Sequence, residues 1–183
     1  MPHAPNAPAM LIGVDFSSRP TARKPVVIAH GSCERGVVRL GGLLRQPTLA
    51  GFAQWLADTP AWTGGFDLPF GLPRELVESL GWPTDWAACL DHYAALERAQ
   101  IRDTFAAFCA ARPAGGKFAH RACDGPAGSS PSMKWVNPPV AYMLHAGVPL
   151  LRAAGAFFPA HQAGDAGLPL NHAGDAGLPL NQA

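Results

Sequence analysis

Two aspartates have the surroundings of a paired-carboxylate site. Asp15 is the one charged residue in the apolar stretch 11–18, which has the composition of a buried β-strand, and Asp67 ends a second such run at 62–67. An ionised carboxylate in a buried strand is unfavourable unless it is paired or bound to a cation. If the two strands are parallel neighbours, both carboxylates lie at one sheet edge and can share a metal ion. Alternatively, Asp67 caps the turn before Pro69 and Asp15 pairs with an arginine; the spacing alone leaves both interpretations open.

Polar and basic residues follow Asp15 directly. Ser17 and Ser18 carry hydroxyl and backbone N–H groups of the kind that bind an anion in a turn, and Arg19 begins a basic segment that reaches Lys24. An ordinary solvated turn has the same composition. Ser17, Ser18 and Arg19 are therefore candidate substrate-binding residues.

A second basic group lies in the glycine- and serine-rich segment 112–131 and just after it. Basic and aromatic side chains in a loop can follow a phosphate backbone and stack on bases. A solvated loop with a docked tryptophan is the alternative. Lys134 is the candidate substrate contact from this group. The group consists of Lys117, His120, Arg121 and Lys134, with Phe118 and Trp135 next to them.

The first third of the chain has the pattern of a sheet. Apolar runs predict strands at 11–18, 25–30 and 37–40, and the short connections between them favour an antiparallel meander. From Leu49 the apolar spacing changes to that of a helix, with Thr48 as its N-cap. A strand reached through a helix is most simply parallel to an earlier strand, so 62–67 is expected to run parallel to the first strand.

Helices dominate the prediction for the rest of the chain. Pro73 opens a helix that Gly81 ends, and Gly147 and Pro149 are expected to end the last helix. The glycine-rich segment 112–131 is predicted to be a loop. The predicted helices are 73–81, about 90–111, and 138 to 147–149.

Composition indicates a single globular domain. The chain has 183 residues, of which 48% are hydrophobic and 15% charged. With 14 basic and 13 acidic residues its net charge is +1, so attraction for nucleic acid must come from a local patch. We find no secretion signal, no run approaching the ~20 apolar residues of a membrane helix, and no indication of a protein partner. The expectation is a cytoplasmic protein with four reduced cysteines.

The two ends of the chain differ from its middle. Residues 1–9 are rich in proline, alanine and asparagine and are expected to be a flexible extension. The sequence 164–171 recurs at 174–181 with a period of ten residues, which indicates a low-complexity tail over 156–183. The folded domain is therefore predicted to span 10–155.

Three segments resemble a bacterial protein family, domain-of-unknown-function family 429, whose members are regarded as predicted nucleases with a ribonuclease H-like fold. The segments are 13–18, 64–74 and 133–140, and the Gly-Phe-Asp-x-Pro-Phe-Gly-Leu-Pro sequence in the second is the specific part. The resemblance extends over about 11–155. It implies an α/β fold with a ribonuclease H-like mixed sheet: three antiparallel strands, a crossover helix and a parallel fourth strand, with flanking helices.

The resemblance also implies an activity, namely hydrolysis of phosphodiester bonds in nucleic acid with Mg²⁺ or Mn²⁺ as cofactor. Carried over by position, Asp15 and Asp67 are the catalytic metal ligands, and Lys134 contacts the substrate. A full domain of this kind continues into a fifth strand and a helix that bring another carboxylate. Because the repeat-containing tail stands there instead, the chain is expected to be a C-terminally truncated family member, either active or inactive.

Two other interpretations stay open. Actin-like and sugar-kinase folds share this strand order and begin with an Asp-bearing strand, so a nucleotide-binding phosphotransfer protein is the second hypothesis. Against it, the sequence shows no second glycine-rich phosphate loop. The third hypothesis is a non-catalytic fragment that binds a partner through an open sheet edge.

Overall fold

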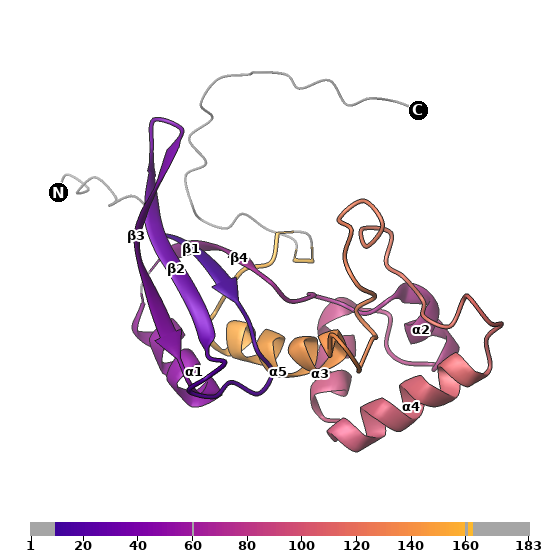
Figure 1. The fold of residues 1–183 in the computed structure, drawn as a ribbon. Coiled ribbons are helices and arrows are strands. Elements are labelled where there is room, and N and C mark those ends of the chain that lie inside the picture. The colour runs from indigo at the N-terminus through magenta and orange to yellow at the C-terminus, as the bar shows by residue number, and fades with distance from the viewer. Residues whose placement is uncertain (1–9, 60, 160, 163–183) are drawn as a thin grey trace.

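Four strands form one mixed sheet in the computed structural model, which describes residues 10–59, 61–159, 161 and 162. The order is β3-β2-β1-β4, with β1–β2 and β2–β3 antiparallel and β1–β4 parallel (Figure 1). This confirms the mixed α/β sheet that the sequence predicts, with β4 at one edge. The predicted extension 1–9 and the tandem repeat lie outside the described residues. The strands are β1 (Met10–Asp15), β2 (Val26–Glu34), β3 (Val37–Gln46) and β4 (Trp62–Phe66).

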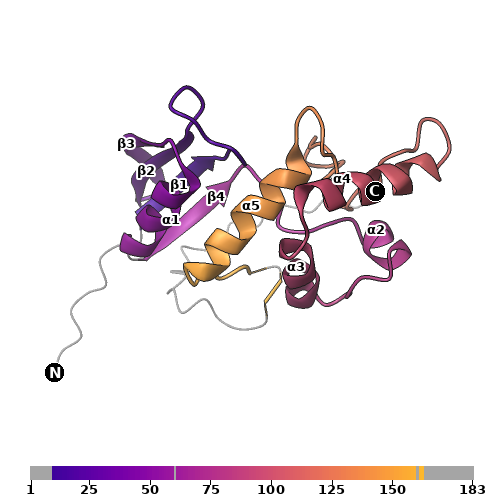
Figure 2. The ribbon, with the colours of Figure 1, turned by 90° about the horizontal axis from the view of Figure 1, so that it is seen from below.

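The helices cover one side of this sheet and continue away from it. α1 crosses over from β3 to β4, and its predicted N-cap is confirmed because Thr48 Oγ1 accepts from Gly51 N at 3.0 Å. α5 lies between the sheet and the α2–α4 group (Figure 2). The helices are α1 (Leu49–Asp58), α2 (Arg74–Ser79), α3 (Trp86–Ala94), α4 (Arg98–Ala110) and α5 (Val140–Ala153).

The single helix predicted over about 90–111 is wrong, because the chain forms α3 and α4 there. α3 ends at Ala94, and Glu97 starts α4 with a capping box. In this box the Glu97 N–H donates to Gln100 Oε1 at 2.7 Å, while the Glu97 side chain accepts from the backbone N–H of Gln100. The apolar face continues across the break, since Tyr93 and Ile101 are both buried, which explains why periodicity alone predicts one helix.

α5 does not end at Gly147 or Pro149 but continues to Ala153, so this predicted stop is also wrong. Pro149 removes one helical hydrogen bond. The surrounding turns compensate through packing, because Val148 and Leu151 are buried on the core side. Packing against the core therefore outweighs the tendency of Gly147 and Pro149 to end the helix.

Gly147 is in this helix because the sheet approaches it closely. A Cβ atom at Gly147 would lie 2.8 Å from Leu68 Cδ2 and 3.1 Å from the ring of Phe16. Phe16 follows the end of β1, and Leu68 follows the end of β4. α5 thus packs directly on the two chain segments that leave the parallel strand pair.

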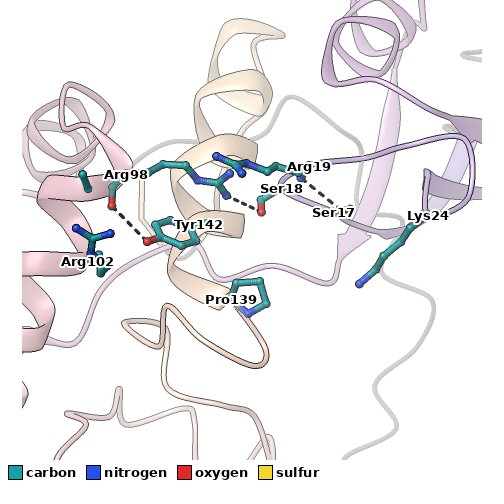
Figure 3. Close-up of a pocket in the computed structure, with 9 residues that line it drawn as sticks. Ser17, Ser18, Arg19, Lys24, Arg98, Arg102, Pro139 and Tyr142 are labelled. Carbon is teal, nitrogen blue, oxygen red and sulfur yellow. Dashed lines mark hydrogen bonds between the residues drawn. The ribbon is translucent and has the colours of Figure 1, made fainter.

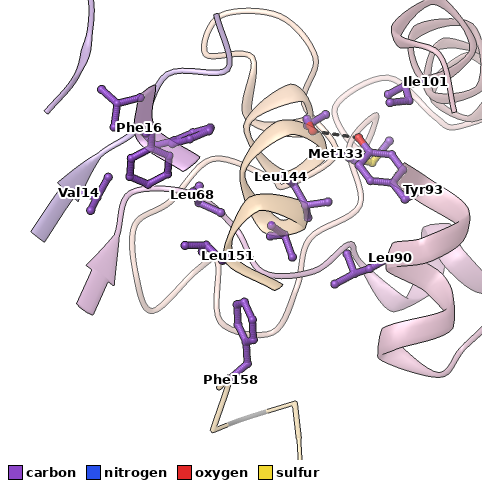
Figure 4. Close-up of a cluster of buried hydrophobic side chains, with 14 of the residues drawn as sticks. Val14, Phe16, Leu68, Leu90, Tyr93, Ile101, Met133, Leu144, Leu151 and Phe158 are labelled. Atoms are coloured by element: carbon purple, nitrogen blue, oxygen red, sulfur yellow. Dashed lines mark hydrogen bonds between the residues drawn. The ribbon is translucent and has the colours of Figure 1, made fainter. Parts of the chain in front are cut away.

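The main core lies between the inner face of the sheet and α1 and α5. Ile12, Val14 and Phe16 are buried, whereas Gly13 and Asp15 are exposed, so β1 shows the alternation of a strand with one covered face. Phe16 packs on Phe52 of α1 with ring centroids 5.8 Å apart. The core continues past α5 to α3 and α4, where Tyr93 donates to the carbonyl of Ala141 at 3.0 Å (Figure 4).

We expect the substitution Gly147→Val to lower the free energy of unfolding by about 1–3 kcal/mol, because the added side chain crowds Phe16 and Leu68. Valine has a higher helix propensity than glycine, so a loss of stability reports crowding. Urea unfolding followed by circular dichroism measures it. Ala153→Val, at an exposed position of the same helix, is the control and should cost less than about 1 kcal/mol. Equal stability of Gly147→Val and the parent chain would show that the close approach is not constraining.

Candidate active site

The two aspartates singled out by the sequence lie side by side. In the parallel pair, Val14 is opposite Phe66, and Asp67 N donates to the carbonyl of Val14 at 2.9 Å. Continuing this register places Asp15 opposite Asp67, on neighbouring strands that lie about 4.8 Å apart. Both side chains are exposed, on the face of the sheet that α1 leaves open.

Asp15 is therefore not the buried charge that the apolar stretch predicts. The strand ends at Asp15, and residues 12, 14 and 16 take the covered face. Strand alternation turns residue 15 toward solvent. Solvation removes the need for a compensating cation in the resting protein, so the argument for a metal must come from what Asp15 and Asp67 line together.

Asp15 and Asp67 line one cavity of about 690 Å³, which we call the carboxylate cavity. Its floor lies where β1 and β4 end, and its walls include the Ser17–Ser18 turn and the loop that follows α4. The polar and ionisable residues lining it are Asp15, Ser17, Ser18, Lys24, Asp67, Arg121, Cys123, Ser129, Ser130 and His161.

A buried ion pair fixes the loop wall of the carboxylate cavity. The carboxylate of Asp124 is fully buried, and its Oδ1 accepts from Arg121 Nε at 2.9 Å and from Arg121 Nη2 at 2.7 Å. Oδ2 accepts from the backbone N–H of Arg121 at 2.8 Å. These bonds hold the Arg121 guanidinium at the cavity wall, opposite the strand ends.

His161 forms another part of this wall. Its ring stacks on Trp86 with centroids 4.9 Å apart. Burial, together with the positive charge of Arg121, lowers the pKa of His161 below its ordinary value. The neutral imidazole is therefore favoured at neutral pH, so His161 adds no positive charge to the wall.

A second pocket of about 510 Å³ adjoins the carboxylate cavity and shares the Ser17–Ser18 turn and Lys24 with it. It lies between this turn and the start of α4 (Figure 3). None of the residues lining it in the described part of the chain is acidic. We call it the cation pocket, after its four basic residues Arg19, Lys24, Arg98 and Arg102.

Arg98 is the most constrained side chain of the cation pocket. Its Nη2 donates to Ser18 Oγ at 2.8 Å, and its Cζ lies 4.2 Å from the ring centroid of Tyr142. The Tyr142 hydroxyl donates to the backbone carbonyl of Arg98 at 3.2 Å. Burial and the neighbouring guanidinium of Arg19 lower the pKa of Arg98 below its ordinary value.

The structure separates the predicted substrate-binding residues into two groups. Ser17 and Ser18 line both cavities, and Arg19 lines the cation pocket. Lys134 is half-buried and lines neither of them; its role in substrate binding stays a prediction. Within the second basic group only Arg121 reaches the carboxylate cavity. Trp135 packs edge-on against Phe118 with ring centroids 5.8 Å apart, which agrees with the docked-tryptophan interpretation.

Sequence reasoning misses Arg98 and Tyr142. Arg98 meets Ser18 across 80 positions of the chain, so no local spacing relates the two. The available signal is indirect: the Glu97–Gln100 capping box shows that a helix begins here, which places Arg98 in its first turn.

The two carboxylates suit one kind of metal ion. In the described part of the chain, no three histidine, cysteine, aspartate or glutamate side chains gather in a way that could hold an ion by themselves. Mg²⁺ keeps several of its waters and is commonly bound by one or two carboxylates together with substrate phosphates. Two adjacent exposed carboxylates at the floor of a cavity match that requirement. They do not match an ion enclosed by protein ligands alone.

Comparisons with protein-family models, with curated proteins and with solved structures give no match for this chain. The fold and the site therefore define its class only as a mixed α/β protein with two adjacent carboxylates at the end of a parallel strand pair. None of the helices in the described residues combines the length and the apolarity that a membrane crossing requires.

We expect Asp124→Asn to lower the free energy of unfolding by about 2 kcal/mol, because it leaves the Arg121 guanidinium half-buried without its counter-charge. Chemical denaturation measures this loss. Asp103→Asn is the matched control: Asp103 pairs with Arg102 at 2.8 Å, but both side chains are exposed, so its effect should stay within about 0.5 kcal/mol. Equal effects of the two substitutions would mean that the Arg121–Asp124 pair does not stabilise the loop.

Proposed function

We propose that this protein is a divalent-metal-dependent phosphodiesterase, a nuclease of ribonuclease H-like architecture, with Asp15 and Asp67 as its metal ligands. One observation carries the proposal: the two carboxylates are adjacent at the ends of β1 and β4 and line one cavity with basic and hydroxyl side chains. Ligands of open α/β sheets bind at the carboxyl ends of strands, which is where this cavity lies. The resemblance of residues 13–18, 64–74 and 133–140 to predicted nucleases supports the same activity.

The reaction is attack of a water oxygen on phosphorus with cleavage of one P–O ester bond, which yields a phosphate monoester and an alcohol. A bound Mg²⁺ or Mn²⁺ supplies charge neutralisation and a more acidic water. Asp15 and Asp67 would hold such an ion at the cavity floor. The hydroxyls of Ser17 and Ser18 and the ammonium group of Lys24 are available to bind the phosphate oxygens that do not react.

Arg121 has a separate role in this proposal. Negative charge increases on the phosphoryl oxygens when water adds, and a fixed positive group nearby stabilises that charge more than a mobile one. Asp124 fixes the Arg121 guanidinium through two bonds to one carboxylate oxygen. Arg121 therefore orients the phosphoryl group and stabilises its increasing negative charge, whereas Asp15 and Asp67 bind the ion.

We expect Asp15→Asn and Asp67→Asn each to reduce metal-dependent cleavage of labelled DNA or RNA by at least about a hundredfold. Substituting a residue that only orients a metal ligand already lowers metal affinity or activity 10- to 100-fold, and these two residues are the ligands themselves. Calorimetric titration with Mn²⁺ should show binding to the parent chain and its loss in both variants.

Asp58→Asn is the control, since Asp58 is exposed at the end of α1 and accepts only from Gln54 at 2.9 Å among the described residues. It should leave cleavage and Mn²⁺ binding unchanged. If the parent chain cleaves neither DNA nor RNA with either ion, or if Asp15→Asn retains full activity, the proposal is wrong.

A further inference from the structure

The hydrolytic step proposed above uses none of the arginines of the cation pocket, although they are the strongest concentration of positive charge near the site. Arg102 is paired with Asp103 at 2.8 Å. Within the described residues, Arg19, Lys24 and Arg98 make no ion pair with a carboxylate. Three basic groups therefore surround one pocket without a counter-charge from the protein.

The structure holds Arg98 in this position through neutral partners. Ser18 accepts a hydrogen bond from one of its N–H groups, and the ring of Tyr142 lies against the face of the guanidinium (Figure 3). A guanidinium has five N–H donors, so donors remain for a ligand. Arg19 lines the same pocket and carries the same charge as Arg98, so an anion bound between the two guanidinium groups would reduce their mutual repulsion.

We propose that the cation pocket binds a phosphate group of the substrate that is not the group being cleaved. Arg19 and Arg98 neutralise this phosphate. Ser17, Ser18 and Lys24 line both cavities, so their hydroxyl and ammonium groups donate hydrogen bonds between this phosphate and the group being cleaved. No metal takes part in this binding. Arg98 is the anchor of the pocket because it is the basic residue that the fold orients most completely.

The chemistry favours phosphate over a carboxylate ligand. The donors come from two separate elements: α4 provides Arg98, and the segment between β1 and β2 provides Arg19 and Lys24. A tetrahedral phosphate presents oxygens in several directions, whereas a carboxylate presents two in one plane. Guanidinium groups are also the usual partners of phosphate in proteins.

The position of the pocket links it to the carboxylate cavity. Ser17, Ser18 and Lys24 line both, so a ligand that occupies one continues into the other across a single turn. A substrate with two successive phosphate groups fits this arrangement, whereas a simple phosphate monoester occupies only one of the two cavities. This inference rests on the proposed function, which makes the carboxylate cavity the place where the other phosphate is cleaved.

Binding without metal tests the inference independently of catalysis. The probe is a fluorescently labelled single-stranded DNA decamer, titrated with the full chain in EDTA and followed by anisotropy at several salt concentrations. We expect Arg98→Gln to weaken binding about tenfold, because charged hydrogen bonds to phosphate are lost. The slope of log K against log salt should also become shallower by about 0.7, the value for one phosphate contact on a single strand.

Two further variants keep this test decisive if Arg98→Gln is unstable. Arg19→Gln changes an exposed side chain that lines only the cation pocket, and it should weaken binding about threefold. Arg39→Gln removes the same charge from β3, opposite Ser32, toward the end of the β2–β3 hairpin away from Asp15. It should leave affinity and slope nearly unchanged. Equal effects of Arg39→Gln and the pocket variants would overturn the inference, since binding would then follow net charge alone.

The two proposals fail in different ways. If the cation pocket binds no phosphate, Arg98→Gln cleaves with the KM of the parent chain, while Asp15→Asn still abolishes cleavage. If the nuclease proposal is wrong, the parent chain shows no metal-dependent cleavage, while the metal-free binding and its loss in Arg98→Gln persist. Competition by a mononucleotide as strong as that by the decamer would show that one phosphate suffices, and would overturn the two-phosphate assignment.

Discussion

The hydrogen bond from Asp67 N to the carbonyl of Val14 closes the parallel pairing of β1 and β4, and the site depends on this pairing. Antiparallel neighbours would place the ends of the two strands at opposite edges of the sheet. The parallel pair instead ends both strands at one edge, and it needs the crossover through α1 to do so. The proximity of the two carboxylates is therefore a consequence of topology rather than of any contact between them.

α5 fixes the chain directly beyond these strand ends. Gly147 leaves room for Phe16 and Leu68 to pack against the helix backbone, and each of these residues follows one of the two aspartates. When Phe16 and Leu68 are held inward, strand alternation directs Asp15 and Asp67 outward. A helix residue distant from the two aspartates in the sequence thus helps to determine where they point, because its lack of a side chain lets Phe16 and Leu68 pack closely.

Local patterns in the sequence predict those parts of the fold that local forces determine. The Thr48 cap, the helix after it and the parallel fourth strand follow from spacing and from the crossover rule. Contacts between distant segments decide the rest. The stop expected at Gly147 fails because a tertiary contact explains the glycine, and the α3–α4 break is marked only by the short Glu97–Gln100 capping signal inside a continuous apolar face. For the site, the sequence identifies Asp15 and Asp67. It wrongly predicts that Asp15 is buried, because an apolar run does not show where the strand ends.

The Ser17–Ser18 turn borders both the two carboxylates and Arg98. The carboxylates lie on one side of the turn and Arg98 on the other, although both signs of charge border the same hydroxyls. An arginine free to reach Asp15 would form an ion pair and neutralise both groups. Ser18 and Tyr142 instead contact Arg98 without supplying negative charge, and the cation–π contact stabilises the guanidinium while leaving its charge in place. The two aspartates and Arg98 thus border one turn, as the proposed binding of a cation by the aspartates and of a phosphate by Arg98 requires.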